Sequence, residues 1–218
     1  TYLSEMAVGE RRLIEGVLYG VAVAGIDVMT DYHEVSLADG RVSKALEGNS
    51  VHPELEMLSV ADDIARSHRF EDAIVELAQA QDASMGQLDS PSESDIREIT
   101  KQKGGAAFTA HLCVLKADVD RHEYENAFSV GYTMQLLDDY LDQTEDERDG
   151  VSTVFTEGYM TESDLEERIS ETKDLIIEQW GDGVGTRRFF KLLDFHKRMG
   201  DVEKKTPFSV QTLVPFYF

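Results

Sequence analysis

Cysteine, proline and basic residues are all scarce in this sequence. The first two shortages narrow the choice of fold, and the third narrows the choice of binding partners. The single cysteine, Cys113, excludes an internal disulfide and a metal cluster held by several thiolates of one chain. With only 4 prolines in 218 residues, long stretches are free to form helices, and most apolar residues recur at helical spacing. We therefore expect an all-α fold and, because no composition shift or long linker interrupts the chain, a single domain over residues 1–218.

Basic residues are outnumbered by acidic ones. The chain carries 43 Asp and Glu against 21 Lys and Arg, which gives a formal net charge of -22. Such a charge disfavours binding to nucleic acid and to anionic membranes, so we expect neither as a partner. The acidic residues are spread along the whole chain, whereas an acidic interaction tail would form a block. We interpret this diffuse acidity as a surface kept hydrated in concentrated salt, and therefore expect a halophilic protein.

Long apolar runs are also missing. The longest, over residues 16–29, is interrupted by Asp27 and is shorter than the roughly 20 residues that span a bilayer. No basic segment followed by a cleavable apolar stretch opens the sequence. The 6 histidines show no paired spacing of the zinc type. We expect no transmembrane segment, a cytoplasmic location and no zinc.

Apolar periodicity, capping residues and helix breakers predict the order of the elements. Asp95 with Glu98, and separately Thr161, are expected to cap helix N-termini. Gly200 is expected to stop the last helix, and residues 82–94, rich in Ser, Asp and Gly, to form the one long loop. The predicted helices cover residues 4–34, 53–68, 70–81, 95–117, 122–145, 161–180 and 187–199.

One predicted helix carries a dense group of carboxylates. At about 100° per residue, Asp138, Asp142 and Asp146 lie within about 80° of one another. Leu136 and Tyr140 fall on the opposite side, so the acidic face is backed by apolar residues. Like charges one turn apart destabilise a helix by roughly 0.2–0.5 kcal/mol per pair, which a bound cation would offset. Carboxylates suit Mg²⁺, which usually also binds substrate phosphates, but a solvated acidic face is equally open at this point.

A second group of carboxylates follows the apolar run of the first predicted helix. Asp27 and Asp31 are one turn apart, and Glu34 falls within about 20° of Asp27. Carboxylates at the end of an otherwise buried helix are costly unless they are paired or bind metal. We therefore expect Asp27 and Asp31 to bind metal. If both groups hold metal that shares one phosphate ligand, Asp27 and Asp31 should also face Asp138 and Asp142 across one cavity.

Four short motifs follow one another along the chain. The pattern FQxxDDxLD is matched, with Met134 in place of Phe, by Gln135, Asp138, Asp139, Leu141 and Asp142. Upstream, residues 103–108 (KGGAAF) resemble KTGxLF, and residues 86–89 (GQLD) resemble a slightly longer GQxxD element. Asp27 and Asp31 take the place of a first aspartate-rich motif. In this order the sequence resembles the class I isoprenoid synthases, most closely the trans-prenyl diphosphate synthases.

The resemblance implies an all-α bundle around a central cavity, in which Mg²⁺ and carboxylates hold a prenyl diphosphate substrate. The implied metal ligands are Asp27, Asp31, Asp138, Asp142 and Asp146. The implied catalytic residues are Asp27, Asp31, Asp138, Asp139, Asp142 and Lys103. The implied diphosphate contacts are Lys103, Arg148 and Gln135. Such an enzyme ionises allylic prenyl diphosphates, for prenyl transfer, head-to-head condensation or cyclisation.

Two features are similar to the head-to-head branch of that family, the phytoene and squalene synthases. The first motif has the form DxxxD, and the run DxxEDxRxG is matched by Asp142, Glu145, Asp146, Arg148 and Gly150. The elements that hold isopentenyl diphosphate in chain-elongating enzymes have no counterpart. This leaves open an alternative, a catalytically degenerate subunit that binds prenyl diphosphate beside a complete synthase. A homodimer and a pairing with a partner synthase are both open.

Overall fold

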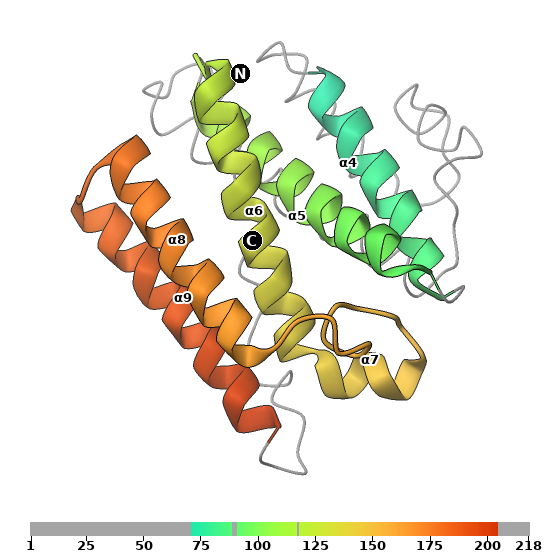
Figure 1. The fold of residues 1–218 in the computed structure, drawn as a ribbon. Helices are drawn as coiled ribbons and strands as arrows, with labels where there is room; N and C mark the ends of the chain where they lie inside the picture. The colour runs from blue at the N-terminus through green and yellow to red at the C-terminus, as the bar shows by residue number, and fades with distance from the viewer. Residues whose placement is uncertain (1–70, 89–90, 117, 205–218) are drawn as a thin grey trace, which may run out of the picture. The chain divides into compact units, whose positions relative to one another are not determined.

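The computed structural model, shown in Figure 1, describes residues 71–88, 91–116 and 118–204. Each regular element in these ranges is a helix and none is a strand, which confirms the all-α fold class. The finer expectation, an isoprenoid synthase bundle, stays a prediction. The helices expected over residues 4–34 and 53–68, which would carry Asp27 and Asp31, lie outside the described residues. Where the chain is described, no helix has the length and apolar character needed to cross a membrane.

The described residues fall into two compact units. The first contains residues 71–85 and 106–121, and the second contains residues 86–105 and 122–204. The single domain expected over the whole chain stays a prediction. Because the aspartate-rich motif and the lysine upstream of it both belong to the second unit, that unit alone positions the described part of the candidate site.

The first unit holds helix α4 (Glu71–Ser84) and the C-terminal part of helix α5 (Glu93–Leu115). The helix expected over residues 70–81 is therefore confirmed, and it continues for three further residues. A short 3-10 helix, η2 (Met85–Leu88), follows it directly. The long loop expected over residues 82–94 is wrong in extent, because helical structure occupies both of its ends.

Helix α5 begins before the capping pair expected at Asp95 and Glu98, and it ends at Leu115, two residues before the expected end. The backbone N–H of Asp95 donates to the Ser92 hydroxyl at 3.3 Å, and the backbone N–H of Ser92 donates to the Asp95 carboxylate at 3.1 Å. These reciprocal bonds are those of a capping box. The prediction chose the wrong cap because Ser92 and Asp95 have the same spacing as Asp95 and Glu98.

The single helix expected over residues 122–145 is instead two helices, α6 (Arg121–Leu141) and α7 (Gln143–Asp149). Between them, Asp142 has φ -88° and ψ 3°, which lies in the sparsely populated bridge region of backbone conformation. Its N–H still donates to the carbonyl of Asp138 at 2.9 Å. The helical hydrogen bonding therefore continues through Asp142, while α6 and α7 run in different directions, as Figure 1 shows.

Helix α8 (Glu162–Trp180) has the bounds expected from the sequence. The hydroxyl of Thr161 accepts from the backbone N–H of Asp164 at 3.2 Å, and the carboxylate of Asp164 accepts from the backbone N–H of Thr161 at 2.7 Å. Gly181, with φ 78°, follows the last turn. Both ends of this helix are thus set by local signals that the sequence displays openly.

Helix α9 (Val184–Glu203) runs through Gly200, where the sequence was expected to stop it. A side chain on Gly200 would meet the ring of Tyr140 at 2.6 Å, so the residue is a glycine because α6 packs closely here. The helix also starts three residues earlier than expected. The glycine near its C-terminus therefore serves packing, and the helix stop was wrong.

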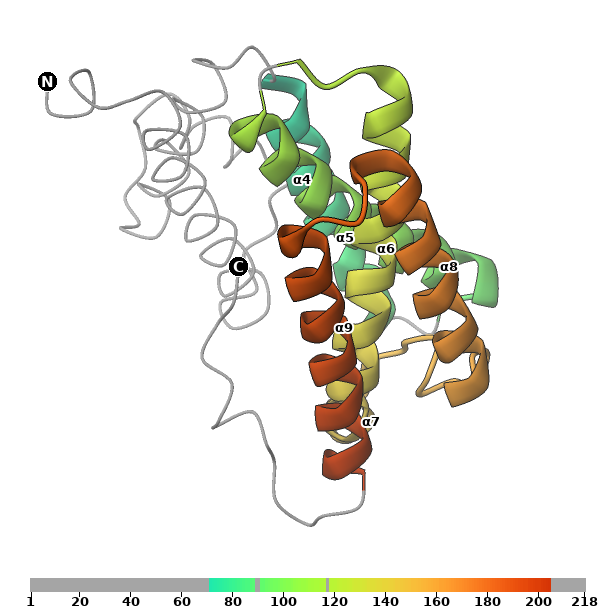
Figure 2. The same ribbon diagram turned by 90° about the vertical axis from the view of Figure 1, so that its left-hand side faces the viewer.

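In the second unit α8 and α9 form an antiparallel hairpin, and Figure 2 shows both in front of α6. The hydroxyls of Thr133 on α6 and Thr172 on α8 are hydrogen bonded at 2.8 Å. The hydroxyl of Tyr140 on α6 donates to Asp201 on α9 at 2.8 Å. The fully buried apolar core of the three helices includes Val130, Leu136, Leu137, Tyr140, Leu165 and Leu193. This packing fixes the C-terminal end of α6, where the carboxylates lie.

Candidate functional site

A close crossing of α5 and α6 brings the upstream motif to the aspartate-rich motif. A side chain on Gly104 would collide with the carbonyl of Gly131 and lie 2.6 Å from Cβ of Gln135. A side chain on the adjacent Gly105 would collide with the ring of Phe128. The two glycines therefore allow the helix backbones to touch, which explains their presence inside a helix despite roughly 1 kcal/mol of lost helix propensity each. This crossing sets the place of Lys103.

Asp139 is the buried member of the aspartate pair, with 7% of its surface exposed. Its carboxylate accepts from the Gln135 amide at 2.9 Å and from the Thr100 hydroxyl at 3.2 Å. Burial raises the pKa of Asp139 to about 6; the charge of Asp138 adds to this rise, whereas the hydrogen bonds and the positive charge of Lys103 oppose it. The α5–α6 crossing thus holds a carboxylate whose charged form is disfavoured.

Asp138, in contrast, is exposed, and the Gln135 amide also reaches its carboxylate at 3.3 Å. Gln135 therefore joins the two aspartates of the motif, which supports its expected place beside them. Asp142 is half-buried at the bend between α6 and α7. The paired aspartates of the motif differ in environment, because one faces the helix crossing and the other faces outward.

Asp146 on α7 is the carboxylate most strongly perturbed by its surroundings. Burial raises its pKa to about 8, and the charges of Asp139, Asp142 and Asp138 raise it further, while Lys103 lowers it. These effects place the carboxylates close enough to one another to interact electrostatically across the bend. The expectation that Asp138, Asp142 and Asp146 gather on one side is compatible with this coupling, although the helix carrying them is not straight.

Lys103 is half-buried, and its charge lowers the pKa of both Asp139 and Asp146. Among the described residues, Lys103 is therefore a cation that interacts with this cluster, and its role as a diphosphate contact stays a prediction. Arg148, the other expected diphosphate contact, is exposed on α7 and forms ion pairs with Glu145 at 2.9 Å and with Asp149 at 2.8 Å. A diphosphate would have to compete with these two acidic residues for Arg148.

The Gly-Gln element at the start of the second unit makes a structural contact. The Gln87 amide donates to the carbonyl of Ser152 at 3.1 Å, and the Gln87 carbonyl accepts from the N–H of Ser152 at 3.0 Å. The bonds hold the turn that follows α7 against η2. Asp89, the last residue of the element, lies outside the described residues. Gln87 thus positions the segment after the aspartate cluster.

The described carboxylates fit a cation by their electrostatics. Burial and mutual repulsion raise the pKa of Asp139 and Asp146, which a nearby positive ion would relieve. Among residues 71–88, 91–116 and 118–204, however, no three Asp, Glu, His or Cys side chains are arranged to hold a metal ion on their own. Mg²⁺ keeps several waters and takes substrate phosphates as ligands, so one or two carboxylates suffice for it. Asp138, Asp142 and Asp146 remain the residues that would hold it.

Sequence reasoning missed Thr100, which donates to the buried Asp139. Thr100 precedes Lys103 by three residues and so lies on the same side of α5. A search for polar residues one turn away from Lys103 would have found it. The sequence singled out Asp139, but it did not indicate that Thr100 would donate a hydrogen bond to it.

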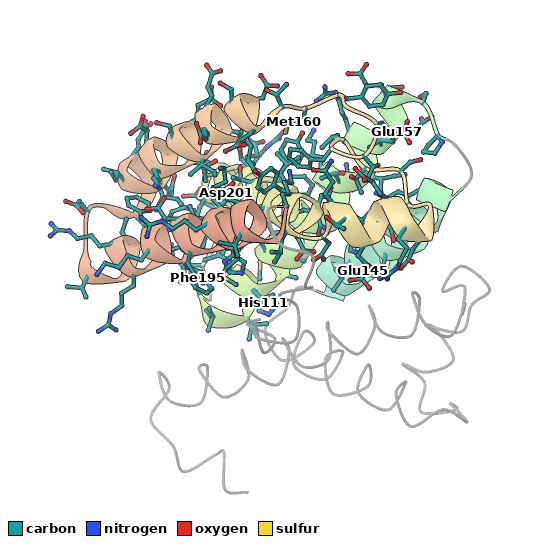
Figure 3. The ribbon with its side chains drawn as sticks, turned by 90° about the horizontal axis from the view of Figure 1, so that it is seen from below. His111, Glu145, Glu157, Met160, Phe195 and Asp201 are labelled. Carbon is teal, nitrogen blue, oxygen red and sulfur yellow. The ribbon has the colours of Figure 1, made fainter. Side chains whose placement is uncertain are left out.

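A buried lysine beneath the end of α6 was also missed. Lys197 on α9 has 8% of its surface exposed, and its ammonium donates to Asp201 and to Glu162, both at 2.6 Å. Burial works against its charged form, but these hydrogen bonds outweigh burial and hold the pKa of Lys197 above its usual value. The ammonium also lies 5.3 Å from the ring centre of Tyr140. Asp201, which accepts one of these hydrogen bonds, is labelled in Figure 3.

In comparisons with known proteins, no family model matches the chain, and no curated protein or solved structure matches it significantly. The similarity to class I isoprenoid synthases is therefore carried by the motifs alone.

Proposed function

We propose that this chain is a Mg²⁺-dependent enzyme of isoprenoid biosynthesis that ionises allylic prenyl diphosphates. The observation that supports the proposal is the convergence of Asp138, Asp139, Asp142 and Asp146 with Lys103 around the bend between α6 and α7. Buried carboxylates whose charged forms are disfavoured are expected where a cation binds. The reaction would be prenyl transfer, head-to-head condensation or cyclisation.

Each residue of the cluster has a role in this proposal. Asp138, Asp142 and Asp146 would hold the metal, with Asp27 and Asp31 supplying carboxylates from the expected first motif. Bound Mg²⁺ supplies the Lewis acidity that makes a diphosphate a good leaving group. Lys103 would add positive charge where negative charge develops on the diphosphate. Gln135 and Thr100 would keep Asp139 in place beneath the metal ligands.

A second candidate is a catalytically degenerate partner subunit that binds prenyl diphosphate. Two observations favour it. The glycines after Lys103 are accounted for by helix packing, and Gln87 is accounted for by its bonds to Ser152. These motif positions would therefore be retained in a chain that had lost turnover. In this candidate the carboxylates still bind Mg²⁺ and diphosphate, but catalysis needs a complete synthase.

Pyrophosphate release from farnesyl and geranylgeranyl diphosphate, with and without Mg²⁺, distinguishes the candidates. The enzyme should release pyrophosphate only with Mg²⁺, Asp138→Ala should abolish release, and Lys103→Ala should slow it by about 10²–10³. Glu147→Ala, which removes an exposed carboxylate of α7 outside the cluster, is the matched control and should retain activity. Turnover that survives Asp138→Ala would reject the metal mechanism. Absence of turnover on any allylic diphosphate would favour the partner subunit.

A further inference from the structure

The outer face of α9 carries an exposed stripe of alternating basic and apolar residues. Val184, Phe195 and Val202 have 71%, 46% and 46% of their surfaces exposed, which is unusual for large apolar side chains. Residues 188, 191 and 198, all basic and all exposed, lie on the same side of the helix at successive intervals of three and seven. Figure 3 labels Phe195 on this helix. In a chain of net charge -22, helix α9 has five basic and three acidic residues.

The outer face of α8 carries the opposite charge. This helix has seven acidic and two basic residues. All seven acidic side chains are exposed, and five of them recur at intervals of three and four, so these five form one ridge along the helix. The ridge consists of Asp164, Glu167, Glu171, Asp174 and Glu178.

The two charged faces lie side by side on the same hairpin. Figure 2 shows α8 and α9 from the side on which both lie in front of α6. A shallow groove of about 430 Å³ separates them, and the ion pair between Lys173 and Asp194, at 2.6 Å, spans it. The acidic ridge and the basic stripe both turn away from the core residues Leu165, Ile169 and Leu193 of their helices. The hairpin thus presents the negatively charged ridge of α8 and the positively charged stripe of α9 to solvent.

We propose that a second copy of this chain docks on the hairpin, with α8 of each copy against α9 of the other. A two-fold axis that runs along the groove, parallel to the helices, creates this arrangement. It places the acidic ridge of each copy against the basic stripe of the other copy. A two-fold axis perpendicular to the helices would instead place the acidic ridge of one copy against the acidic ridge of the other copy, where like charges repel. Charge therefore selects one of the two face-to-face dimers.

The register of the proposed dimer follows from the hairpin itself. Rotation about an axis parallel to the helices leaves every residue at its own height, and the Lys173–Asp194 ion pair gives the relative height of the two helices. With Lys173 and Asp194 at the same height, Arg188 of one copy is level with Gln179 of the other copy, which is next to Glu178.

The remaining two cations of the stripe also fall beside acidic residues. Lys191 is level with Ile176 of the other copy, about 3 Å along the axis from Asp174. Arg198 is level with Ile169 of the other copy, about 3 Å along the axis from Glu167. Long side chains span such offsets easily. Three pairs in each half of the dimer are therefore matched without any sliding of one copy past the other.

The size of this face suits a dimer. Two helices of 19 and 20 residues, each about 10 Å wide and about 30 Å long, offer about 600 Å² per copy. The total of about 1,200 Å² is at the lower end of specific interfaces. Phe195 and the two valines supply apolar area that ion pairs alone lack. Nucleic acid or an anionic membrane would meet the acidic ridge of α8 together with the stripe, which disfavours both.

Sedimentation analysis of charge-exchange variants at an ionic strength of about 0.15 M, where surface charges are only partly screened, tests the proposal. One variant makes the stripe acidic, with Arg188→Glu, Lys191→Glu and Arg198→Glu. The other makes the ridge basic, with Glu167→Lys, Asp174→Lys and Glu178→Lys. All six positions are exposed, and circular dichroism will verify that each variant keeps its helices.

The wild type should be a dimer, and each variant alone should be monomeric because both contacts then repel. An equimolar mixture of the two variants should restore a dimer, since every contact in that mixed pair is attractive. A single chain with all six changes keeps the net charge of -22 and should again form a dimer, which controls for net charge. A monomeric wild type, variants that remain dimeric alone, or a mixture that stays monomeric would each overturn the proposal.

Discussion

Asp146 is a half-buried carboxylate whose nearest electrostatic neighbours are other carboxylates. Its pKa of about 8 means that the folded protein binds a proton there at pH values where the unfolded chain, with a pKa of about 3.9, has released it. The charged form therefore destabilises the fold. Asp139, with a pKa of about 6, contributes in the same direction. A functional cation would explain why the sequence tolerates this loss of stability.

The first prediction concerns this pH dependence. Because the folded state binds more protons between about pH 4 and pH 8, the free energy of unfolding should fall across that range and the penalty should be complete above about pH 8. Asp146→Asn removes the titrating group, so this variant should gain stability relative to the wild type as pH rises. Urea unfolding at several pH values in this range, without divalent metal, measures the difference.

Glu147→Gln is the control for that measurement, since it removes an exposed carboxylate one residue away and subtracts the general effect of net charge. A stability difference between Asp146→Asn and the wild type that is constant with pH would contradict the assignment. So would a wild type that becomes the more stable protein at pH 8.

At the scale of helices, the α5–α6 crossing at Gly104 places Lys103 and Thr100 beside Asp139. Gly104→Ala should destabilise the protein by about 1–3 kcal/mol, because the new methyl group collides with the Gly131 carbonyl and overpacks the crossing. Chemical unfolding compared with the wild type measures the loss.

The matched control for this change is Gly185→Ala in the first turn of α9, where an added side chain meets nothing within 4 Å. It should be neutral or stabilise by up to about 1 kcal/mol, through helix propensity alone. If both alanine variants had the same stability, the close approach of α5 and α6 would not be the reason for Gly104.

Helices could be predicted from the sequence where their ends depend on local signals. Thr161 and Gly181 set the bounds of α8 through capping bonds within a few residues, and that helix was predicted correctly. The passage of α9 through Gly200 depends instead on packing between distant parts of the chain. Helical periodicity does not report such contacts, because Tyr140, whose ring excludes a side chain at Gly200, is sixty residues away in sequence.

Some features of the candidate site could likewise be predicted from the sequence, and others could not. The sequence singled out Lys103 and the aspartates by type and spacing, and the structure places Lys103 and the described aspartates within electrostatic reach of one another. It did not reveal that Asp139 is buried while Asp138 is exposed, because that depends on which side of α6 meets α5. The facing of Asp27 and Asp31 toward this cluster lies outside the described residues and stays a prediction.

At the scale of the whole molecule, the net charge of -22 should make stability depend on salt. Molar potassium chloride shortens the screening length to about 3 Å and weakens repulsion among the acidic side chains. The thermal midpoint should therefore rise from low to molar salt at pH 7, and it should rise less at pH 4, where many carboxylates are protonated. A midpoint that is unchanged or lower in molar salt would leave the acidity without a halophilic explanation.

The proposed Mg²⁺ and diphosphate site can be tested by titration calorimetry with inorganic diphosphate in molar potassium chloride, in the presence and absence of Mg²⁺. This test applies both to an active enzyme and to a partner subunit, because both need carboxylates that hold Mg²⁺ and diphosphate together. We expect diphosphate to bind the wild type and Glu147→Ala only with Mg²⁺, and Asp138→Ala to abolish or strongly weaken binding. Diphosphate binding that is independent of Mg²⁺, that survives Asp138→Ala unchanged, or that is absent from the wild type would contradict the proposed site.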